Sequence, residues 1–362
     1  LGIFHESNID ISPNLTATLG LRYDYSHKKI AYDTEAMMAI TANVMGKTAT
    51  NVLTSILNNS VSDDFNQLLP KAGLTFRFKN GSNIYAVVSK GYRSGGYNIQ
   101  MFSDILQTEL NNNKANAMGG NYEVPHDANT YDKVNKTIAY NPETSWNYEI
   151  GAHINLIGSL LHLDMLAYLM HVRNQQLSVM AGNYGFGRMM VNAGRSRSLG
   201  AEAMLQGCAI DNRLTWSVSY GMADATFREY IDNVTVNGQE TEINYRGKRV
   251  PYVPRHTFGA FVDYRHDFNS SALRSLTIGI NANAQGRIYW DEANTYSQKL
   301  YSVIGAHIDA DFGIVGLSVW GRNLFDAHYN TFAIASSASG EKLFFGERSA
   351  PHQIGVDLKI NL

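Results

Sequence analysis

Apolar and polar side chains alternate along most of this chain with a period of two residues. The alternation is regular in residues 14–28, 144–158 and 354–362, where nearly every second side chain is apolar. Successive side chains of a β-strand point to opposite faces, so each segment is predicted to be a strand with one apolar and one polar face. Thirteen segments follow this pattern, at residues 2–10, 14–28, 69–79, 83–94, 144–158, 160–172, 189–208, 212–227, 255–268, 274–290, 299–312, 315–326 and 349–362.

The predicted strands are long, and the connections between them alternate in length. Most segments have ten residues or more, whereas a typical strand has about five or six. Strands of about ten residues are needed to cross a bilayer at a tilt. Short turns near Gly81, Ser159, Asn212 and Gly313 alternate with long loops, as they do in outer-membrane barrels. The long loops are predicted at residues 29–68, 95–143, 173–188, 228–254, 291–298 and 327–348.

Aromatic residues are sorted toward the two ends of the predicted strands, as expected for rings at two membrane interfaces. A soluble propeller is the alternative fold, but no repeat of about 40–50 residues is visible. The sequence therefore predicts an all-β fold, a transmembrane antiparallel β-barrel. The aromatic residues near the long loops are Tyr25, Tyr92, Trp146, Tyr168, Tyr220, Tyr289 and Trp290, and those near the short turns are Phe76, Phe78, Trp216, Phe268 and Phe312.

Composition excludes several other classes of protein. The formal net charge of -2 over 362 residues removes the usual electrostatic drive for nucleic-acid binding. Cys208 is the only cysteine, so neither an intrachain disulfide nor a cysteine-based zinc site can form. The longest apolar stretch, residues 160–170, is shorter than the roughly 18 residues of a membrane helix.

The number of predicted strands is odd, and this bears on how the barrel closes. Bacterial barrels close with an even number of antiparallel strands. An open sheet edge within lipid leaves backbone N–H and C=O groups unpaired, at a cost of several kcal/mol for each group. We therefore expect further strands before residue 1, in the parent protein or in a companion chain.

Six segments resemble, in order, motifs of TonB-dependent outer-membrane receptors. Each match alone is weak, but six in the family's order over nearly the whole chain make a specific signal. The segments are Leu69–Phe78, Asn83–Asn98, Tyr140–Gly151, Asn192–Glu202, Val250–His256 and Gly321–Tyr329.

The resemblance implies a 22-stranded barrel with a plug in its lumen. Residues 1–362 would form the last thirteen or so strands, with the plug and the first strands outside this chain. The family imports scarce, large ligands across the bacterial outer membrane, most often ferric siderophores and otherwise haem, cobalamin or glycans. A TonB complex supplies the energy through the plug. A passive porin and a surface-binding barrel remain the alternatives.

No enzymatic constellation is found. Gly46–Thr48 resembles the end of a P-loop, but Thr41 stands where the first glycine is required. The segment His5–Ile9 lacks the second histidine of a zincin helix. We therefore expect no catalytic residue, no resident metal and no cofactor. Contact with haem or a metal chelate is an alternative role for one of four loop histidines, which are His126, His256, His328 and His352.

Ligand contact is expected from arginine, aromatic and amide side chains in or beside the long loops. Aromatic rings stack on a chelate or a sugar, and arginine pairs with an anionic group. The Asn-rich stretches 111–116 and 129–141 are expected to be mobile. Glu149, Glu202 and Arg322 are expected to face the lumen and to pair with the plug or with neighbouring strands. The predicted ligand residues are Arg93, Tyr97, Asn98, Arg173, Gln176, Tyr184, Arg188, Tyr289 and Trp290.

Overall fold

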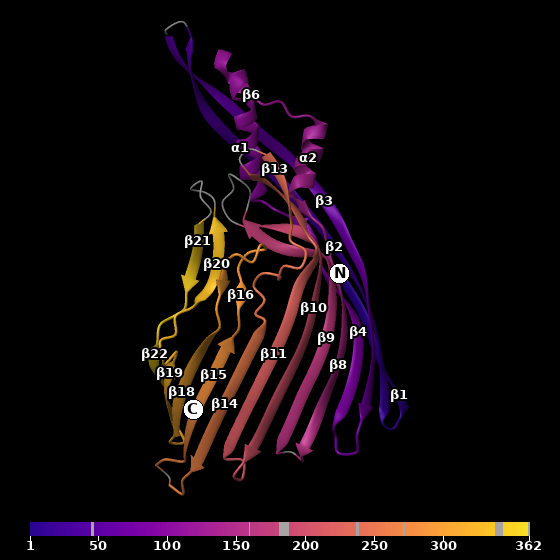
Figure 1. Ribbon diagram of the computed structural model, residues 1–362, viewed down its shortest axis with the longest axis vertical. Helices are drawn as coiled ribbons and strands as arrows, with labels where there is room; N and C mark the ends of the chain where they lie inside the picture. The colour runs from indigo at the N-terminus through magenta and orange to yellow at the C-terminus, as the bar shows by residue number, and fades with distance from the viewer. Residues whose placement is uncertain are drawn as a thin grey trace.

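One continuous antiparallel sheet dominates the computed structural model, which describes residues 1–44, 47–158, 160–180, 188–236, 239–270, 272–336 and 343–360 (Figure 1). Each of the thirteen predicted segments corresponds to one strand of this sheet, and consecutive strands along the chain are neighbours. The strands, in order, are β1 (Gly2–Ser12), β2 (Leu15–Val44), β3 (Lys47–Arg77), β4 (Asn83–Arg93), β8 (Glu143–Ile157), β9 (Leu161–Met180), β10 (Arg188–Ala209), β11 (Leu214–Glu229), β14 (His256–Asp267), β15 (Ser275–Gln285), β18 (Tyr301–Asp311), β19 (Val315–Arg322) and β22 (Gln353–Ile360).

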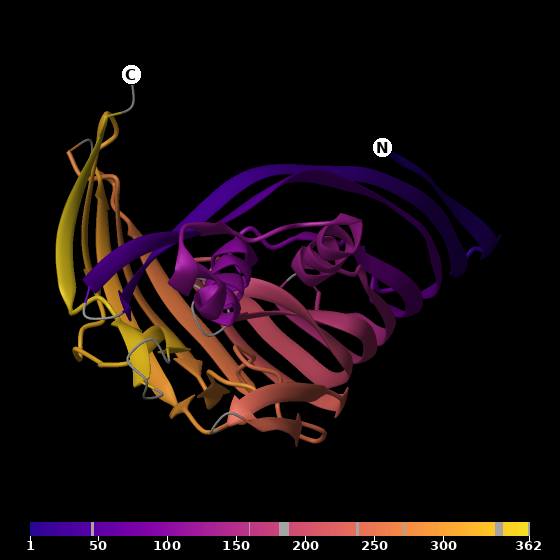
Figure 2. The same cartoon turned by 90° about the horizontal axis from the view of Figure 1, so that it is seen from above.

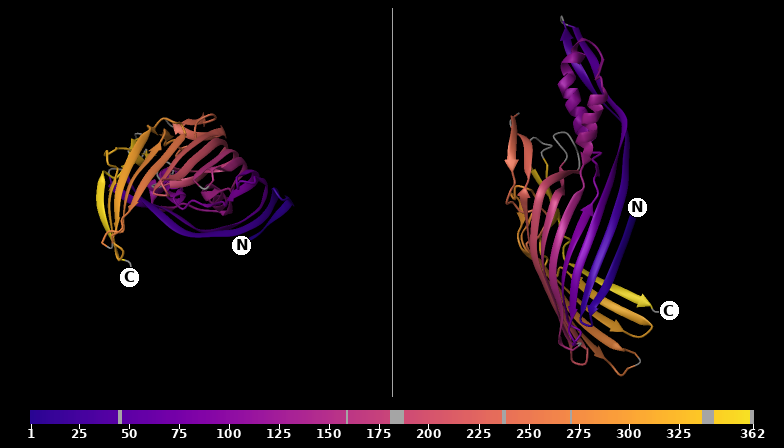
Figure 3. Two further views of the ribbon diagram at one scale, coloured as in Figure 1. Left: turned by 90° about the horizontal axis from the view of Figure 1, so that it is seen from below. Right: turned by 90° about the vertical axis from the view of Figure 1, so that its right-hand side faces the viewer.

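The sheet curves into an open wall. Seen from above and from below, the chain termini lie toward the two ends of an arc (Figures 2 and 3). Within the described residues β1 pairs only with β2, and β22 pairs only with β19. Each of these two edge strands therefore has one side without a partner in the described residues. None of the helices in the described part of the chain is long and apolar enough to span a membrane.

The register gives the wall one apolar and one polar face. Ala72, Val88, Tyr148, Leu169 and Leu199 lie in one cross-strand row and share the convex face. Large apolar side chains remain exposed along this face from one end of the sheet to the other. Exposed apolar bands of this kind contact lipid in outer-membrane barrels.

The concave face is polar, as expected for a lumen. Glu149 accepts a hydrogen bond of 2.9 Å from the Tyr85 hydroxyl. Glu202 pairs in register with Gly221 on the same face, and Arg322 lies beside Trp320 with 4.5 Å between guanidinium and ring centroid. A neighbouring strand thus supplies the partner of Glu149, whereas the partner of Arg322 lies on its own strand, β19.

Aromatic rings on the concave face lie over glycines of the next strand. Tyr168 pairs with Gly200, and a Cβ atom added to Gly200 would lie 2.4 Å from the tyrosine ring. Tyr168 therefore faces the lumen, and its predicted place in the outer aromatic belt is wrong. The strand register decides its face, because Tyr168 lies between the outward-facing Ala167 and Leu169.

We expect Gly200→Val to destabilise the sheet, because the Tyr168 ring must leave its position over the glycine. Overpacking of this kind costs about 1–3 kcal/mol. The urea midpoint of the folded protein in detergent measures the effect. Ala201→Val, which adds a side chain of the same type on the lipid face, is the matched control; equal midpoints for the two variants would contradict the prediction.

The predicted loop 29–68 is wrong, because β2 and β3 continue as a paired hairpin from Leu15↔Phe76 to Val44↔Lys47. The strands have 30 and 31 residues, and the hairpin rises well above the rest of the sheet (Figure 3). The alternation is weaker there than in the membrane segments, because apolar runs such as residues 36–40 interrupt it.

Two helices lie against the hairpin, where the sequence predicted mobile Asn-rich loops. Helix α1 (Met101–Asn113) leads into the 3₁₀ helix η1 (Lys114–Gly119), and α2 (Ala128–Ile138) follows the short strand β6 (Tyr122–Glu123). The Asp127 carboxylate caps α2 by accepting from the Thr130 backbone N–H at 2.8 Å, and this bond lowers the carboxyl pKa. Apolar residues of both helices are buried against the hairpin, which explains the order; they are Phe102, Leu106, Leu110, Val134 and Ile138.

The other long loops also contain short strands. β9 continues through Arg173 to Met180, so the predicted loop 173–188 begins too early. The loops predicted at 95–143, 228–254 and 327–348 likewise carry paired strands. These additional strands are β5 (Gly96–Tyr97), β7 (Ala139–Tyr140), β12 (Ile231–Val236), β13 (Gln239–Asn244), β16 (Ile288–Tyr289), β17 (Ser297–Gln298), β20 (Asn330–Ser336) and β21 (Leu343–Arg348).

Candidate functional site

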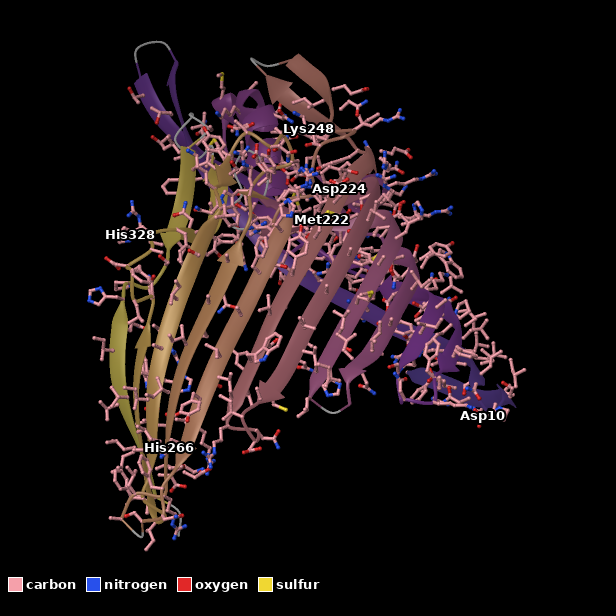
Figure 4. All side chains as sticks on the ribbon, turned by 60° about the horizontal axis from the view of Figure 1, so that its bottom comes forward. Asp10, Met222, Asp224, Lys248, His266 and His328 are labelled. Carbon is pink, nitrogen blue, oxygen red and sulfur yellow. The ribbon has the colours of Figure 1, made fainter. Side chains whose placement is uncertain are left out.

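The long connections gather at one end of the sheet, above its concave face (Figures 1 and 2). Met222 and Asp224 lie at the upper part of β11, and Lys248 lies above them among the long connections (Figure 4). Asp10 and His266 lie toward the opposite end, where the short turns are. The candidate site is therefore the loop cluster together with the lumen wall beneath it.

Asn98 joins the loop after β4 to the start of β10. Its amide nitrogen donates to the Met190 carbonyl at 2.8 Å, and its amide oxygen accepts from the Met190 N–H at 2.7 Å. The side chain is only 7% exposed. Asn98 thus completes a backbone pair in the manner of a neighbouring strand, which positions the loop and leaves little amide surface for a ligand.

Gln176 has a similar role on β9. Its side-chain nitrogen donates to the carbonyls of Ser94 and Asn141, at 2.9 and 3.0 Å. The Glu143 carboxylate accepts from the Gln176 backbone N–H at 2.6 Å. Three segments far apart in the sequence are therefore fastened together. Asn192 extends the network by donating to the Asn141 carbonyl at 2.9 Å.

We expect Asn98→Leu to loosen this network, because the Met190 N–H and C=O both lose their partner. Leaving buried polar groups unsatisfied costs about 1–3 kcal/mol each. Hydrogen exchange of residues 94–98 and 188–192 is the measurement, and it should accelerate at least tenfold. Asn112→Leu, on an exposed helix position, is the control; unchanged exchange in Asn98→Leu would contradict the assigned role.

Arg188 lies beside two stacked aromatic rings from distant loops. Its guanidinium carbon is 5.2 Å from the Tyr252 ring centroid and 5.1 Å from that of Phe332. The two rings are stacked at 11°. Arg188 also donates to the Tyr252 hydroxyl oxygen at 3.1 Å and, through Nε, to the Ser178 hydroxyl at 2.8 Å. This Arg188 cluster, defined as Arg188, Tyr252 and Phe332, joins three loops at the mouth of the wall.

Tyr252 is held in an unusual backbone conformation, with φ of 65°. Bulky residues seldom adopt this left-handed region, so the surrounding contacts must maintain it. Its backbone N–H donates to the Tyr289 carbonyl at 2.9 Å, and its ring is 5.6 Å from that of Trp290. Tyr289 and Trp290 therefore support Tyr252, and Trp290 is 7% exposed.

Three tyrosines of the loops keep their protons at neutral pH. Burial and the Asp63 carboxylate raise the pKa of Tyr97, whose hydroxyl donates to Asp63 at 2.7 Å. Burial, with Asp232 nearby, raises the pKa of Tyr230 and raises that of Tyr245 to about 12. The rings of Tyr230 and Tyr245 pack with Phe227 in a small core formed by the loops. These hydroxyls are neutral donors at neutral pH.

The structure thus gives the predicted ligand residues different surroundings. Arg93 ends β4 on the lumen side, opposite Glu143. Arg173 shares the convex face with His171, away from the lumen, so we withdraw it from the ligand set. Tyr184 lies outside the described residues. Sequence reasoning missed Tyr252 and Phe332, because their partners are about 60–150 positions away along the chain.

Three of the four loop histidines have acidic neighbours, whereas His256 lies 2.9 Å from the Tyr220 hydroxyl. His126 lies 3.0 Å from the Glu109 carboxylate, and His328 and His352 lie 3.6 and 3.8 Å from that of Asp326. Over the described ranges, no group of three or more His, Cys, Asp or Glu side chains has an arrangement that holds a metal ion.

Comparisons with solved structures show the same architecture. The ferric yersiniabactin uptake receptor FyuA from Yersinia pestis superposes with a TM-score of 0.68 at 18% identity, over 99% of this chain and 45% of that one. The siderophore receptor PiuA from Acinetobacter baumannii gives 0.64 at 19% identity, over 99% and 42%. The copper transporter OprC gives 0.62 at 14% identity, over 99% and 47%. The chain thus spans less than half of each.

Curated relatives agree. The pesticin receptor of Yersinia enterocolitica is 24% identical over 302 residues, which is 81% of this chain and 37% of the relative. The ferrichrome outer membrane transporter/phage receptor of Escherichia coli is 31% identical over 94 residues, or 25% of this chain and 12% of the relative. The family described as TonB dependent receptor-like, beta-barrel matches residues 1–324. With its curved antiparallel wall and its loops gathered at one end, this chain belongs to the TonB-dependent receptors of the bacterial outer membrane.

Proposed function

We propose that this chain forms the C-terminal part of the barrel of an energised importer, and that the complete receptor takes up a ferric siderophore. The observation that carries the proposal is the loop cluster above a polar, concave wall. The wall supplies a lumen surface, and the loops present Arg93, Tyr97 and the Arg188 cluster above it. Arginine and aromatic side chains are suited to an anionic, aromatic chelate.

The missing part of the barrel is part of this proposal. The chain spans 37–47% of the pesticin receptor and of the three solved structures compared above, and each edge strand has one side unpaired in the described residues. An edge within lipid is costly, so we propose that preceding strands pair with β1 and β22. Glu149 and Glu202 then face a plug, and TonB acts through that plug. Asn98, Gln176 and Trp290 position the loops in this scheme.

Iron uptake by the complete receptor tests the function. A host strain that lacks the receptor gene should lose uptake of the radiolabelled ferric siderophore, and the cloned gene should restore it only when TonB is present. Restoration without TonB would favour a passive porin. Haem, cobalamin and a labelled oligosaccharide are run in parallel, so uptake of one of these alone would reassign the ligand.

The ligand residues are tested within the same strain. We expect the triple replacement Arg93→Ala, Tyr97→Ala and Tyr252→Ala to lower uptake at limiting ligand at least tenfold, because charge and stacking partners are lost together. Lys114→Ala, at an exposed position on the helical segment, is the control. Full uptake by the triple variant would contradict ligand capture by these loops.

A further inference from the structure

Three arginines lie together on the convex face, where β9 and β10 leave the apolar band. Arg197 pairs in register with His171, which pairs with Trp146. One row further from the band, Arg195 pairs with Arg173. Rows on one face of a strand are about 7 Å apart, so the three guanidinium groups occupy a small area. This convex arginine cluster, Arg173, Arg195 and Arg197, faces away from the lumen.

The cluster carries excess positive charge. Arg195 forms an ion pair with Glu229 at 3.2 Å. Asp224, the other outward carboxylate nearby, forms an ion pair with Arg249 at 2.9 Å. Arg173 and Arg195 are exposed, so their guanidinium groups are open to an external anionic oxygen.

The height of the cluster places it at the membrane interface. Trp146 stands in the same row as Arg197, and Tyr148 contacts the His171 ring edge-on at 6.4 Å. Rings of this kind lie at the level of lipid head groups. The long loops lie on the same side, so this interface belongs to the extracellular leaflet.

An apolar groove on the convex face begins directly below the arginines. Its first row contains Tyr148, Leu169 and Leu199, one row below Trp146, His171 and Arg197. Small side chains open the groove across β2, β3, β4 and β9, while larger ones form its walls. The small outward side chains that open it are Ala17, Ala72, Ala86 and Ala167.

We propose that the convex arginine cluster and this groove form a binding site for a phosphorylated lipid of the extracellular leaflet. The guanidinium groups hold a phosphate, since arginine matches phosphate oxygens with two parallel donors. Acyl chains occupy the groove, and charge complementarity selects an anionic lipid over a neutral one. The site lies on the opposite face of the wall from the proposed ligand path, so it does not depend on the identity of the imported ligand.

Lipid binding to the complete receptor in detergent tests the site, with diphosphoryl lipid A as the probe. We expect native mass spectrometry to show retained probe on the unmodified receptor. The triple variant Arg173→Gln, Arg195→Gln, Arg197→Gln should bind it about a hundredfold more weakly, at roughly fivefold for each cation. Lys114→Gln, Arg246→Gln, Lys248→Gln removes three exposed extracellular cations elsewhere and should bind normally.

Two further arms separate lipid binding from binding of a free anion and from misfolding. In the first arm, lipid A without its phosphates should bind the unmodified receptor weakly, at the level of the phosphorylated probe on the glutamine variant. In the second arm, inorganic phosphate should displace the probe only at millimolar concentration. The variant Arg173→Lys, Arg195→Lys, Arg197→Lys keeps the charge, so its affinity for the probe should stay within about tenfold of that of the unmodified receptor. Weak binding by the glutamine variant is then due to the lost charge and not to misfolding. Ala167→Phe fills the groove and should weaken binding, whereas Ala203→Phe outside it should not.

The proposal is overturned by any of three results. These are unchanged binding by the glutamine variant, equal binding of the dephosphorylated lipid, and displacement by inorganic phosphate at the probe's own concentration. The last would identify a free-anion site.

Discussion

Leu57→Ala should release the helical segment from the β2–β3 hairpin while the membrane sheet stays folded. Leu57 has no exposed surface, and it packs with Tyr32, Phe102 and Ile138 where the two helices meet the hairpin. Truncating a buried leucine costs about 2–5 kcal/mol. That loss falls on a small core far from the membrane strands, so we expect local rather than global unfolding.

Hydrogen exchange of α1 and α2 measures this release, and it should rise by one to three orders of magnitude. Exchange in β8–β11 should stay unchanged, as should the heat-modified mobility of the receptor on gels. Met37→Ala is the matched control, because Met37 belongs to the same hairpin but is 62% exposed on its other face. Protection of both helices at the level of unmodified protein would contradict the packing role of Leu57.

Polar contacts limit how far the helices move in this variant. Glu109 accepts from the Ser55 hydroxyl at 2.6 Å and lies 3.0 Å from the His126 ring nitrogen. The Tyr32 hydroxyl donates to Asn135 at 2.9 Å. These bonds join the helices to the hairpin independently of Leu57, so the segment should open reversibly and remain tethered.

The membrane strands could be predicted from sequence, because lipid on one side and a polar lumen on the other impose a strict alternation. Residues 146–156 show it without interruption, and they lie within β8. The hairpin extension above the membrane was mistaken for a loop. The hairpin is covered by helices that come about 50–100 positions later in the chain. No local pattern near Leu57 therefore reveals that this face of the hairpin is buried.

The sequence predicted only part of the candidate site, because its contacts also join segments that are far apart in the chain. Asn98 and Gln176 stand out in sequence as polar residues in loops, but their hydrogen bonds to backbone groups appear only in three dimensions. Arg188 lies at the mouth and its ligand contact stays a prediction, and its partners Tyr252 and Phe332 come from separate loops. Which aromatic ring meets which arginine depends on how those loops fold, and alternation along a strand carries no such information.

Arg188→Ala should separate the loops at the mouth and weaken ligand capture roughly 10–100-fold. A desolvated cation–π contact contributes about 2 kcal/mol, and each hydrogen bond from a charged group about 1.5–3 kcal/mol. Arg188 provides two such ring contacts and holds Ser178 and Tyr252 by hydrogen bonds. Without Arg188, the loop arrangement that captures the ligand becomes a minor population. The apparent affinity then falls in proportion to the size of that population.

The readout has two parts, so that loop order and capture are separated. Hydrogen exchange of residues 250–254 and 330–334 should accelerate, and uptake of the ferric siderophore should require higher concentrations at an unchanged maximal rate. Arg188→Lys keeps a cation near the rings but loses the planar set of donors, so it should give an intermediate result. Arg246→Ala, an exposed arginine on a neighbouring loop, should leave both unchanged. Accelerated exchange with normal uptake would confine Arg188 to loop packing, and unchanged exchange would contradict its role in joining the loops.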